Sequence, residues 1–243
     1  MGRSERCSAL RLARRYGSSD SLGGTFPLPP LRALLLGVAV VKVKICGITN
    51  LDDARLAVAA GADALGFIFV ENTPRFVTPH RAESIIRDLP PFVTPVGVFW
   101  DHPPGQVKAT AEQCGLRALQ FHGDEPPESL TDYRLPIIKT IKLATATDLS
   151  RMDGYRVAAF LLDSHARWSE GEPRQPIEWT LARQAASRGS IILSAGLTAE
   201  NVAEAVRIAR PYAVDVNSGV EAQPGRKDAD KVRRFILHAK GAA

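Results

Sequence analysis

Cysteine is scarce in this sequence: it occurs three times in 243 residues, at Cys7, Cys46 and Cys114. An odd number of cysteines, without the short paired spacing of a metal site, indicates neither a disulfide framework nor a zinc site. A reducing compartment is the simplest inference, and we therefore expect a cytoplasmic protein.

Long hydrophobic runs are also absent. The longest run, from Ala33 to Val41, has nine residues, which is about half of what a membrane-spanning helix needs. We therefore expect no membrane partner. The balance of 45% hydrophobic and 23% charged residues excludes a collagen-like, coiled-coil or mainly disordered chain. The length suits one (β/α)8 barrel or two small domains.

Positive charge is concentrated at the start of the chain. The formal net charge is +5, but residues 1–40 hold six Arg against Glu5 and Asp20, which leaves +1 for the remainder. A body so close to neutral argues against a nucleic-acid partner. The Arg- and Ser-rich composition of residues 1–40 fits a transit peptide, a disordered tail or a start site assigned too early. We expect residues 41–243 to form a single domain.

From Val41 onward, apolar β-rich runs alternate with segments of helical pattern. The expected strands are Lys42–Cys46, Ala62–Val70, Val93–Phe99, Ala118–Phe121, Ile137–Ile141, Ala158–Asp163, Ile191–Ser194 and Ala213–Val216. The expected helices are Leu51–Ala60, Pro79–Asp88, Pro104–Gln113, Ser129–Tyr133, Thr147–Met152, Trp179–Ser187, Ala199–Ala209 and Asp228–Ala239. The fourth and fifth helices have the weakest pattern, because Pro126 and Pro127 crowd the start of the fourth.

Eight strand–helix pairs at this spacing predict an α/β fold, a (β/α)8 TIM barrel with a parallel, closed eight-stranded sheet. The GxGxxG and GxxxxGK[ST] patterns do not occur, which disfavours a doubly wound nucleotide-binding sheet. In such a barrel, the chemistry takes place at the carboxyl ends of the strands.

Two residues at expected strand ends could transfer protons. Cys46 ends the first strand, where Gly47 would let the chain turn and expose the thiol, although a single Cys is usually a small buried hydrophobe. Asp163 ends the apolar sixth strand, where an unpaired carboxylate would be costly. A helix cap or a loop ion pair is the alternative interpretation of Asp163. Together the two residues suit a base and an acid acting on one substrate.

Two loops have the composition of a phosphate site. Gly196 follows the seventh strand, and Ser218 and Gly219 follow the eighth. Small residues let backbone N–H groups approach an anion, and this pair of loops is a frequent phosphate site in the fold. Ordinary left-handed turns are the alternative. Arg75 could bind a carboxylate through its guanidinium fork or be a surface residue.

Nine segments carry a resemblance to a known family. In chain order they are KICGITN (44–50), GADALGFIF (61–69), TPRFV (73–77), VGVF (96–99), QFHGDE (120–125), LPIIKTIK (135–142), FLLDS (160–164), ILSAGLTAENV (192–202) and DVNSGVE (215–221), followed by PGRKD (224–228). This set, which covers nearly all of residues 42–238, resembles the phosphoribosylanthranilate isomerases of tryptophan biosynthesis. The resemblance implies a small-molecule substrate, no metal or organic cofactor, and an Amadori rearrangement.

The resemblance also implies a role for each site residue. Asp163 would be the general acid that opens the ribose ring, and Cys46 the general base that removes the proton at C2. Arg75 would bind the anthranilate carboxylate. The Gly196, Ser218 and Gly219 loops would bind the phosphate, and His122 and Asp215 would line the pocket. We expect the substrate complex to hold Cys46 as a thiolate, with its pKa below the ordinary value, and Asp163 as a neutral acid.

One segment departs from the family pattern. Residues 167–176 replace the glycine-rich loop that the family usually carries after the sixth strand, and Ala195 replaces a frequent glycine. These changes leave open a diverged isomerase acting on another sugar-phosphate amine. A noncatalytic phosphate-binding barrel is the alternative from a different class, but simple binding requires neither Cys46 nor Asp163. The sequence does not indicate an oligomeric state.

Overall fold

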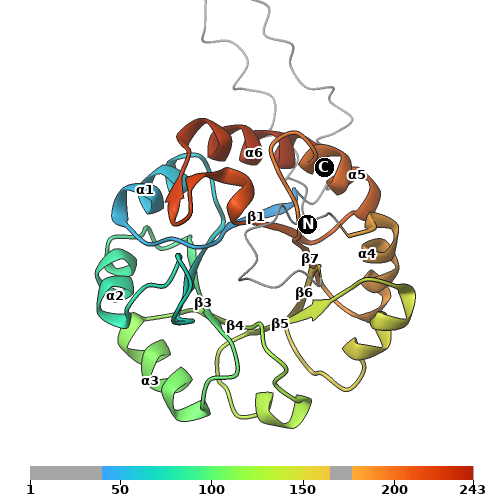
Figure 1. The fold of residues 1–243 in the computed structure, drawn as a ribbon, viewed down its shortest axis with the longest axis horizontal. Helices are drawn as coiled ribbons and strands as arrows, with labels where there is room; N and C mark the ends of the chain where they lie inside the picture. The colour runs from blue at the N-terminus through green and yellow to red at the C-terminus, as the bar shows by residue number, and fades with distance from the viewer. Residues whose placement is uncertain (1–39, 165–176, 243) are drawn as a thin grey trace, which may run out of the picture. The chain divides into compact units, whose positions relative to one another are not determined.

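The computed structural model describes residues 40–164 and 177–242. Within these ranges, eight strands form one closed sheet with the helices arranged around it (Figure 1). The strands are β1 (Lys42–Ile45), β2 (Ala64–Ile68), β3 (Thr94–Phe99), β4 (Ala118–Phe121), β5 (Ile137–Lys142), β6 (Ala159–Asp163), β7 (Ile191–Leu193) and β8 (Ala213–Val216). The predicted segments 1–40 and 167–176 lie outside the described residues, except for Val40.

Each strand pairs in parallel with the next one along the chain, and β1 closes the ring by pairing with β8. In that closing pair, Lys44 is opposite Asp215 and Ile45 is opposite Val216. Parallel pairing throughout and a closed ring confirm the predicted TIM barrel. No helix of the described residues is long and apolar enough to cross a membrane.

The helices match six of the eight predictions. The α-helices among the described residues are α1 (Leu51–Ala59), α2 (Pro79–Arg87), α3 (Pro104–Cys114), α4 (Trp179–Ala185), α5 (Val202–Ala209) and α6 (Ala229–Gly241). Short 3₁₀ turns also occur there, η1 (Pro127–Leu130), η2 (Ala146–Met152), η3 (Ala186–Arg188) and η4 (Ser218–Val220).

The predicted fourth and fifth helices are wrong, because η1 and η2 occupy those places. Pro126 is extended and Pro127 opens η1, so the segment has no preceding turn of helix to extend. η2 begins with a capping box between Thr145 and Asp148 and ends just before Gly154, whose φ is +89°. Because a left-handed residue commonly ends a helix, Gly154 limits η2 to a short turn.

Two apolar clusters account for most of the core of the described residues. One cluster consists of strand residues only and forms the barrel interior: Ala64, Val96, Ala118, Ile138, Ala159, Leu161, Ile192 and Ala213. The other cluster lies between the strands and the surrounding helices. Because side chains alternate along a strand, residues two or four positions after an interior residue also point inward, closer to the carboxyl end of the strand.

A two-stranded hairpin of β9 (Glu221–Gln223) and β10 (Arg226–Lys227) follows β8 and was not predicted. Its turn contains Gly225, with φ +80°, and a Cβ there would lie 2.7 Å from the carbonyl oxygen of Pro74. The Gly225 carbonyl accepts a hydrogen bond from Thr49 Oγ1 at 2.7 Å. The hairpin is therefore fixed against the loops that follow β1 and β2.

Candidate active site

A layer of buried polar side chains lies on the mouth side of the apolar interior. Asp163 follows Leu161 by two residues and Asp215 follows Ala213 by two, so both carboxyls continue the inward faces of their strands. Cys46 is likewise buried, against Ile68 and Val98. Alternation along the strands thus brings predicted site residues from β1, β6 and β8 to the inside of one barrel.

The Cys46 thiol is not exposed at the mouth, contrary to expectation. The residue is 4% exposed, and a Cβ placed on Gly66 would lie 2.6 Å from its Sγ. Gly47 does turn the chain, with φ +73°. The thiol nevertheless stays buried, because Gly66 on β2 has no side chain and the thiol occupies the space beside it. Burial raises the pKa of Cys46, while the Lys44 ammonium acts in the opposite direction.

Lys44 and Asp215 form a buried ion pair beside this thiol. Lys44 Nζ donates to Asp215 Oδ1 at 2.7 Å, and the two side chains are 4% and 7% exposed. Ser194 Oγ on the segment after β7 donates to Asp215 Oδ2 at 3.3 Å. Asp215, predicted to line the pocket, therefore fixes Lys44, which was not predicted to be part of the site.

Asp163 and His122 are brought together at the ends of β6 and β4. His122 Nε2 lies 3.5 Å from Asp163 Oδ2, and the Ser164 amide donates to Asp163 Oδ1 at 2.8 Å. His122 Nδ1 lies 3.2 Å from Thr140 Oγ1. The Trp100 ring lies 5.3 Å, centroid to centroid, from the His122 ring. His122 therefore fixes one side of the Asp163 carboxyl.

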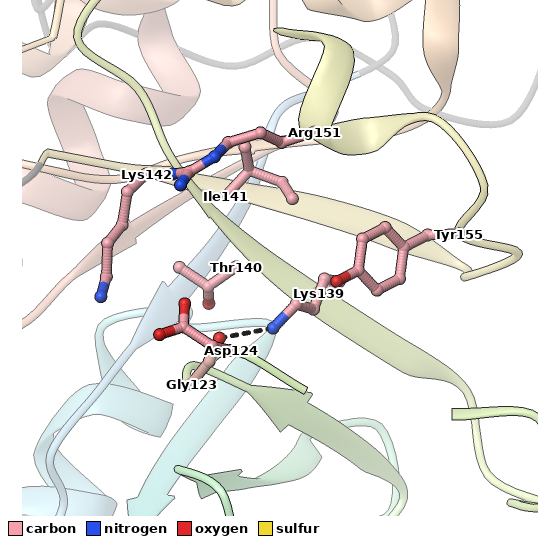
Figure 2. Close-up of a pocket in the computed structure, with 8 residues that line it drawn as sticks. All are labelled: Gly123, Asp124, Lys139, Thr140, Ile141, Lys142, Arg151 and Tyr155. Carbon is pink, nitrogen blue, oxygen red and sulfur yellow. Dashed lines mark hydrogen bonds between the residues drawn. The ribbon is translucent and has the colours of Figure 1, made fainter. Parts of the chain in front are cut away.

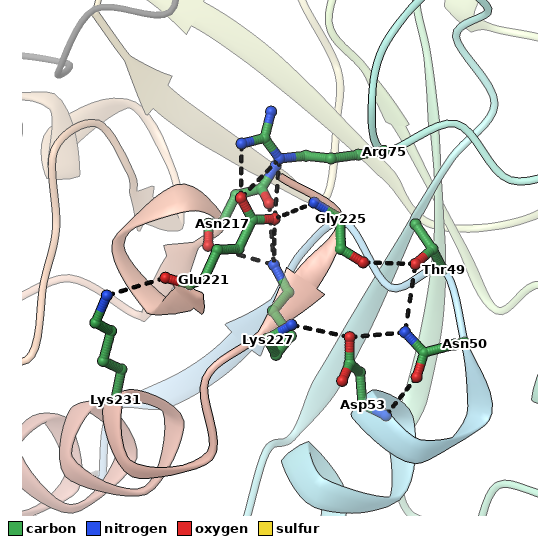
Figure 3. A network of polar contacts seen from close by, with 9 residues as sticks. All are labelled: Thr49, Asn50, Asp53, Arg75, Asn217, Glu221, Gly225, Lys227 and Lys231. Atoms are coloured by element: carbon green, nitrogen blue, oxygen red, sulfur yellow. Dashed lines mark hydrogen bonds and ion pairs between the residues drawn. The ribbon is translucent and has the colours of Figure 1, made fainter. Parts of the chain in front are cut away.

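Arg75 is held by the hairpin after β8 (Figure 3). Its Nε and Nη2 donate to Glu221 at 3.0 and 2.7 Å, and Lys227 Nζ binds the same carboxylate at 3.1 Å. Burial raises the pKa of Glu221, but Arg75 and Lys227 together hold it below its ordinary value. Figure 3 shows the remaining guanidinium nitrogen of Arg75 directed away from Glu221. One edge of the guanidinium is thus fixed and another remains available to a carboxylate.

The loops after β7 and β8 touch through their backbones. A Cβ on Gly219 would overlap the carbonyl oxygen of Leu197, so only glycine permits this approach. Ala195 and Gly196 both have left-handed backbones, with φ +65° and +63°. The family often has glycine at position 195, and this left-handed conformation explains that preference. The conformation costs alanine about 1 kcal/mol more than glycine. The predicted phosphate loops therefore form one continuous surface.

A cavity of about 220 Å³ lies along β5 and adjoins the site, since its lining residue Thr140 contacts His122 and Lys142 is opposite Asp163 in the β5–β6 pair (Figure 2). Lys139, Lys142, Arg151 and Tyr155 line it, together with Thr140 and the Gly123 loop. Lys139 is neutralised by Glu125 at 2.6 Å, and Lys142 Nζ lies 4.6 Å from the centroid of the Trp100 ring. No predicted site residue lines this cavity. The described residues also contain no cluster of His, Cys, Asp and Glu suited to a metal.

Comparison with known proteins connects this geometry to a family. The family model described as N-(5′-phosphoribosyl)anthranilate (PRA) isomerase matches residues 43–238 of this chain. The chain belongs to this isomerase family. The isomerases of Pelobacter propionicus and Geobacter sulfurreducens are each 50% identical to it, over 83% of this chain and 96% and 100% of theirs.

Solved structures of isomerases from this family are also similar to the chain. The Thermotoga maritima isomerase superimposes with a TM-score of 0.78 at 42% identity, over 83% of this chain and 99% of that one. A second isomerase structure, with a TM-score of 0.75 and 42% identity over the same shares, contains reduced 1-(o-carboxyphenylamino)-1-deoxyribulose 5-phosphate. The family fold confirms the predicted TIM barrel.

Three charged residues of the site, Lys44, Glu221 and Lys227, were not predicted from the sequence. Lys44 precedes Cys46 by two residues, so strand alternation alone indicates that both side chains share the inward face. Glu221 and Lys227 gave no comparable signal, because the β9–β10 hairpin that brings them together was not predicted.

Proposed function

We propose that this chain rearranges N-(5′-phosphoribosyl)anthranilate to 1-(2-carboxyphenylamino)-1-deoxyribulose 5-phosphate, a step of tryptophan biosynthesis. The order of groups around the barrel supports this proposal. Asp163 ends β6, the phosphate loops follow β7 and β8, and Cys46 follows β1. A sugar phosphate anchored in the middle of this arc has the acid on one side and the base on the other.

The two proton transfers follow from this arrangement. Neutral Asp163 donates its proton to the ribose ring oxygen, the bond from C1 to that oxygen breaks, and the anilino nitrogen forms a protonated Schiff base. The Cys46 thiolate then removes the proton from C2, which gives an enolamine. The enolamine then gains a proton at C1 and loses the proton of its C2 hydroxyl, which gives the ketone. These two transfers offset the proton donated by Asp163 and the proton taken up by Cys46, so the reaction balances without an oxidant or reductant.

Arg75 is the group that we assign to the anthranilate carboxylate. It follows β2, which pairs with β1, the strand that Cys46 follows. Its contact with Glu221 fixes the guanidinium before substrate arrives, so less side-chain freedom is lost on binding. The nitrogen directed away from Glu221 can donate a charge-assisted hydrogen bond to the carboxylate (Figure 3).

The phosphate is assigned to the backbone N–H groups of Gly196, Ser218 and Gly219. Asn201 stabilises the first of these loops, since its Nδ2 donates to the Gly196 carbonyl at 2.9 Å and its Oδ1 accepts from the Thr198 amide at 2.8 Å. Fixed N–H donors that need no rearrangement are the usual protein ligands of a sugar phosphate.

Replacing Gly219 by Ala is expected to raise KM for the phosphorylated substrate about tenfold or more. The new Cβ would overlap the Leu197 carbonyl oxygen and force the two phosphate loops apart. Overpacking of this kind also lowers the free energy of unfolding by about 1–3 kcal/mol. Steady-state kinetics and chemical denaturation measure the two effects.

The matched control is Gly105→Ala, at an exposed position of α3 where an added Cβ meets no atom within 4 Å. We expect unchanged KM and slightly greater stability, because alanine is the better helix former. An unchanged KM in Gly219→Ala would remove these loops from the phosphate site.

The overall proposal is tested by complementing a tryptophan auxotroph that lacks this isomerase, and by assaying the purified protein. The full chain and a version that starts at residue 41 should both restore growth, since we propose that residues 41–243 form the complete catalytic domain. We also propose a cytoplasmic location, in keeping with the free thiols of Cys46 and Cys114. A folded full chain without activity would instead favour the diverged isomerase or the noncatalytic barrel.

A further inference from the structure

Lys44 and Cys46 occupy one small region of the barrel interior. Both are on the inward face at the end of β1, and both approach Gly66 on β2. A Cβ placed on Gly66 would lie 2.6 Å from Cys46 Sγ and 3.1 Å from Lys44 Cε. The lysine stem and the thiol therefore lie against the same point of the neighbouring strand.

Folding stability does not explain the buried ion pair of Lys44 and Asp215. Lys44 is 3% exposed and Asp215 is 6% exposed, and removing two charges from water usually costs as much as their attraction returns. Apolar residues fill the layer directly beneath, as Ala213 and Ala64 do. The buried pair of Lys44 and Asp215 lies in the layer that contains the proposed base.

We propose that Lys44 is a positioning residue whose ammonium group stabilises the thiolate of Cys46 during proton abstraction, while Asp215 holds that ammonium against the sulfur. This inference rests on the proposed function, because it takes Cys46 as the base. It gives Asp215, which was predicted only to line the pocket, a defined task.

The charges that face Cys46 come from three elements. Lys44 on β1 and Lys227 on β10 favour the thiolate, and Asp215 on β8 opposes it. The contacts from β2 and β3 are the apolar side chains Ile68 and Val98. Lys227 is the weaker influence on the sulfur, because its ammonium binds Glu221 at 3.1 Å and Asn217 Oδ1 at 3.0 Å.

Lys44 keeps its charge throughout the useful pH range. Burial lowers the pKa of its ammonium, but the adjacent Asp215 and Cys46 outweigh this effect and raise the pKa to about 12. Burial raises the pKa of the Cys46 thiol above its ordinary value, and the nearby Lys44 ammonium limits this rise. The permanent positive charge of Lys44 is therefore the main influence that favours the thiolate.

The two partners of this ion pair should shift the Cys46 pKa in opposite directions. Lys44→Met removes the favourable charge, and we expect the Cys46 pKa to rise by about one to two units. Asp215→Asn removes the opposing charge, and we expect the pKa to fall by about one unit. A pair with only a structural role would give the same response to the loss of either partner.

The experiment titrates Cys46 by the ultraviolet absorbance of its thiolate in the full chain without substrate. Cys7→Ser and Cys114→Ser form the background, and the same background with Cys46→Ser is subtracted, so that only Cys46 contributes. Lys44→Arg, which keeps the charge, should retain a pKa close to that of the background protein. Thermal unfolding of each variant identifies any that fails to fold, and Lys44→Gln then replaces Lys44→Met.

Opposite shifts in the two variants, with rescue by Lys44→Arg, support the proposal. Shifts in the same direction, or an unchanged pKa in the lysine variant, would overturn it. This titration needs no turnover, so it separates the inference from the proposed function. A chain that shows the opposite shifts but no isomerase activity would contradict the function alone.

Discussion

Replacing Asp163 by Asn is expected to lower kcat about 10²–10⁴-fold, the usual contribution of a positioned general acid. Asn has nearly the same shape, and its amide oxygen can still accept from the Ser164 amide, which lies 2.8 Å from Asp163 Oδ1. It cannot supply a proton to the ribose ring oxygen. The ring-opening step loses its acid while the barrel keeps its packing.

Steady-state kinetics measure this effect, and thermal unfolding checks the fold. KM should change little, because phosphate and carboxylate binding are assigned to groups on other elements. The matched control is Asp153→Asn, an exposed carboxylate that pairs with Arg188 at 3.3 Å; its activity should equal that of the unaltered chain. If Asp163→Asn kept full kcat in folded protein, the acid would have to be sought elsewhere in the barrel.

Cys46→Ser should produce a loss of similar size, about 10²–10⁴-fold in kcat/KM, for a different reason. The hydroxyl fits the space beside Gly66, but it ionises far less readily than a thiol. Burial raises the pKa of Cys46 in the free protein, so the thiolate fraction increases as the pH rises toward that pKa. The kcat/KM of the unaltered chain should accordingly increase with pH in this range, and Cys46→Ser should lose that increase.

Cys114→Ser is the matched control for the thiol. Burial raises the pKa of Cys114 to about 11, so this group stays protonated at ordinary pH. Its Sγ lies 3.3 Å from the carbonyl oxygen of Pro79, on the helical side of the fold. Activity and its pH profile should be unchanged. An unaltered pH profile in Cys46→Ser would exclude this thiol as the base.

Strand alternation and motif spacing were enough to predict where the proposed acid and base lie. The segments KICGITN and FLLDS each place a titratable residue at the end of an apolar run, and parallel strands bring such ends to one face. Local pattern was less reliable outside the barrel. At η1 and η2, proline and a left-handed glycine limited the chain to 3₁₀ turns where helices were predicted.

The sequence by itself determined the barrel, the isomerase family and the residues expected at the mouth, because strand periodicity and motif order are local properties of the chain. Only the tertiary structure decided the electrostatics. Lys44 meets Asp215 across 171 residues and Arg75 meets Glu221 across 146, since barrel closure joins the first strand to the last. Burial of the Cys46 thiol likewise depends on Gly66 of the next strand. Such contacts follow from ring closure and side-chain packing, which no local pattern encodes.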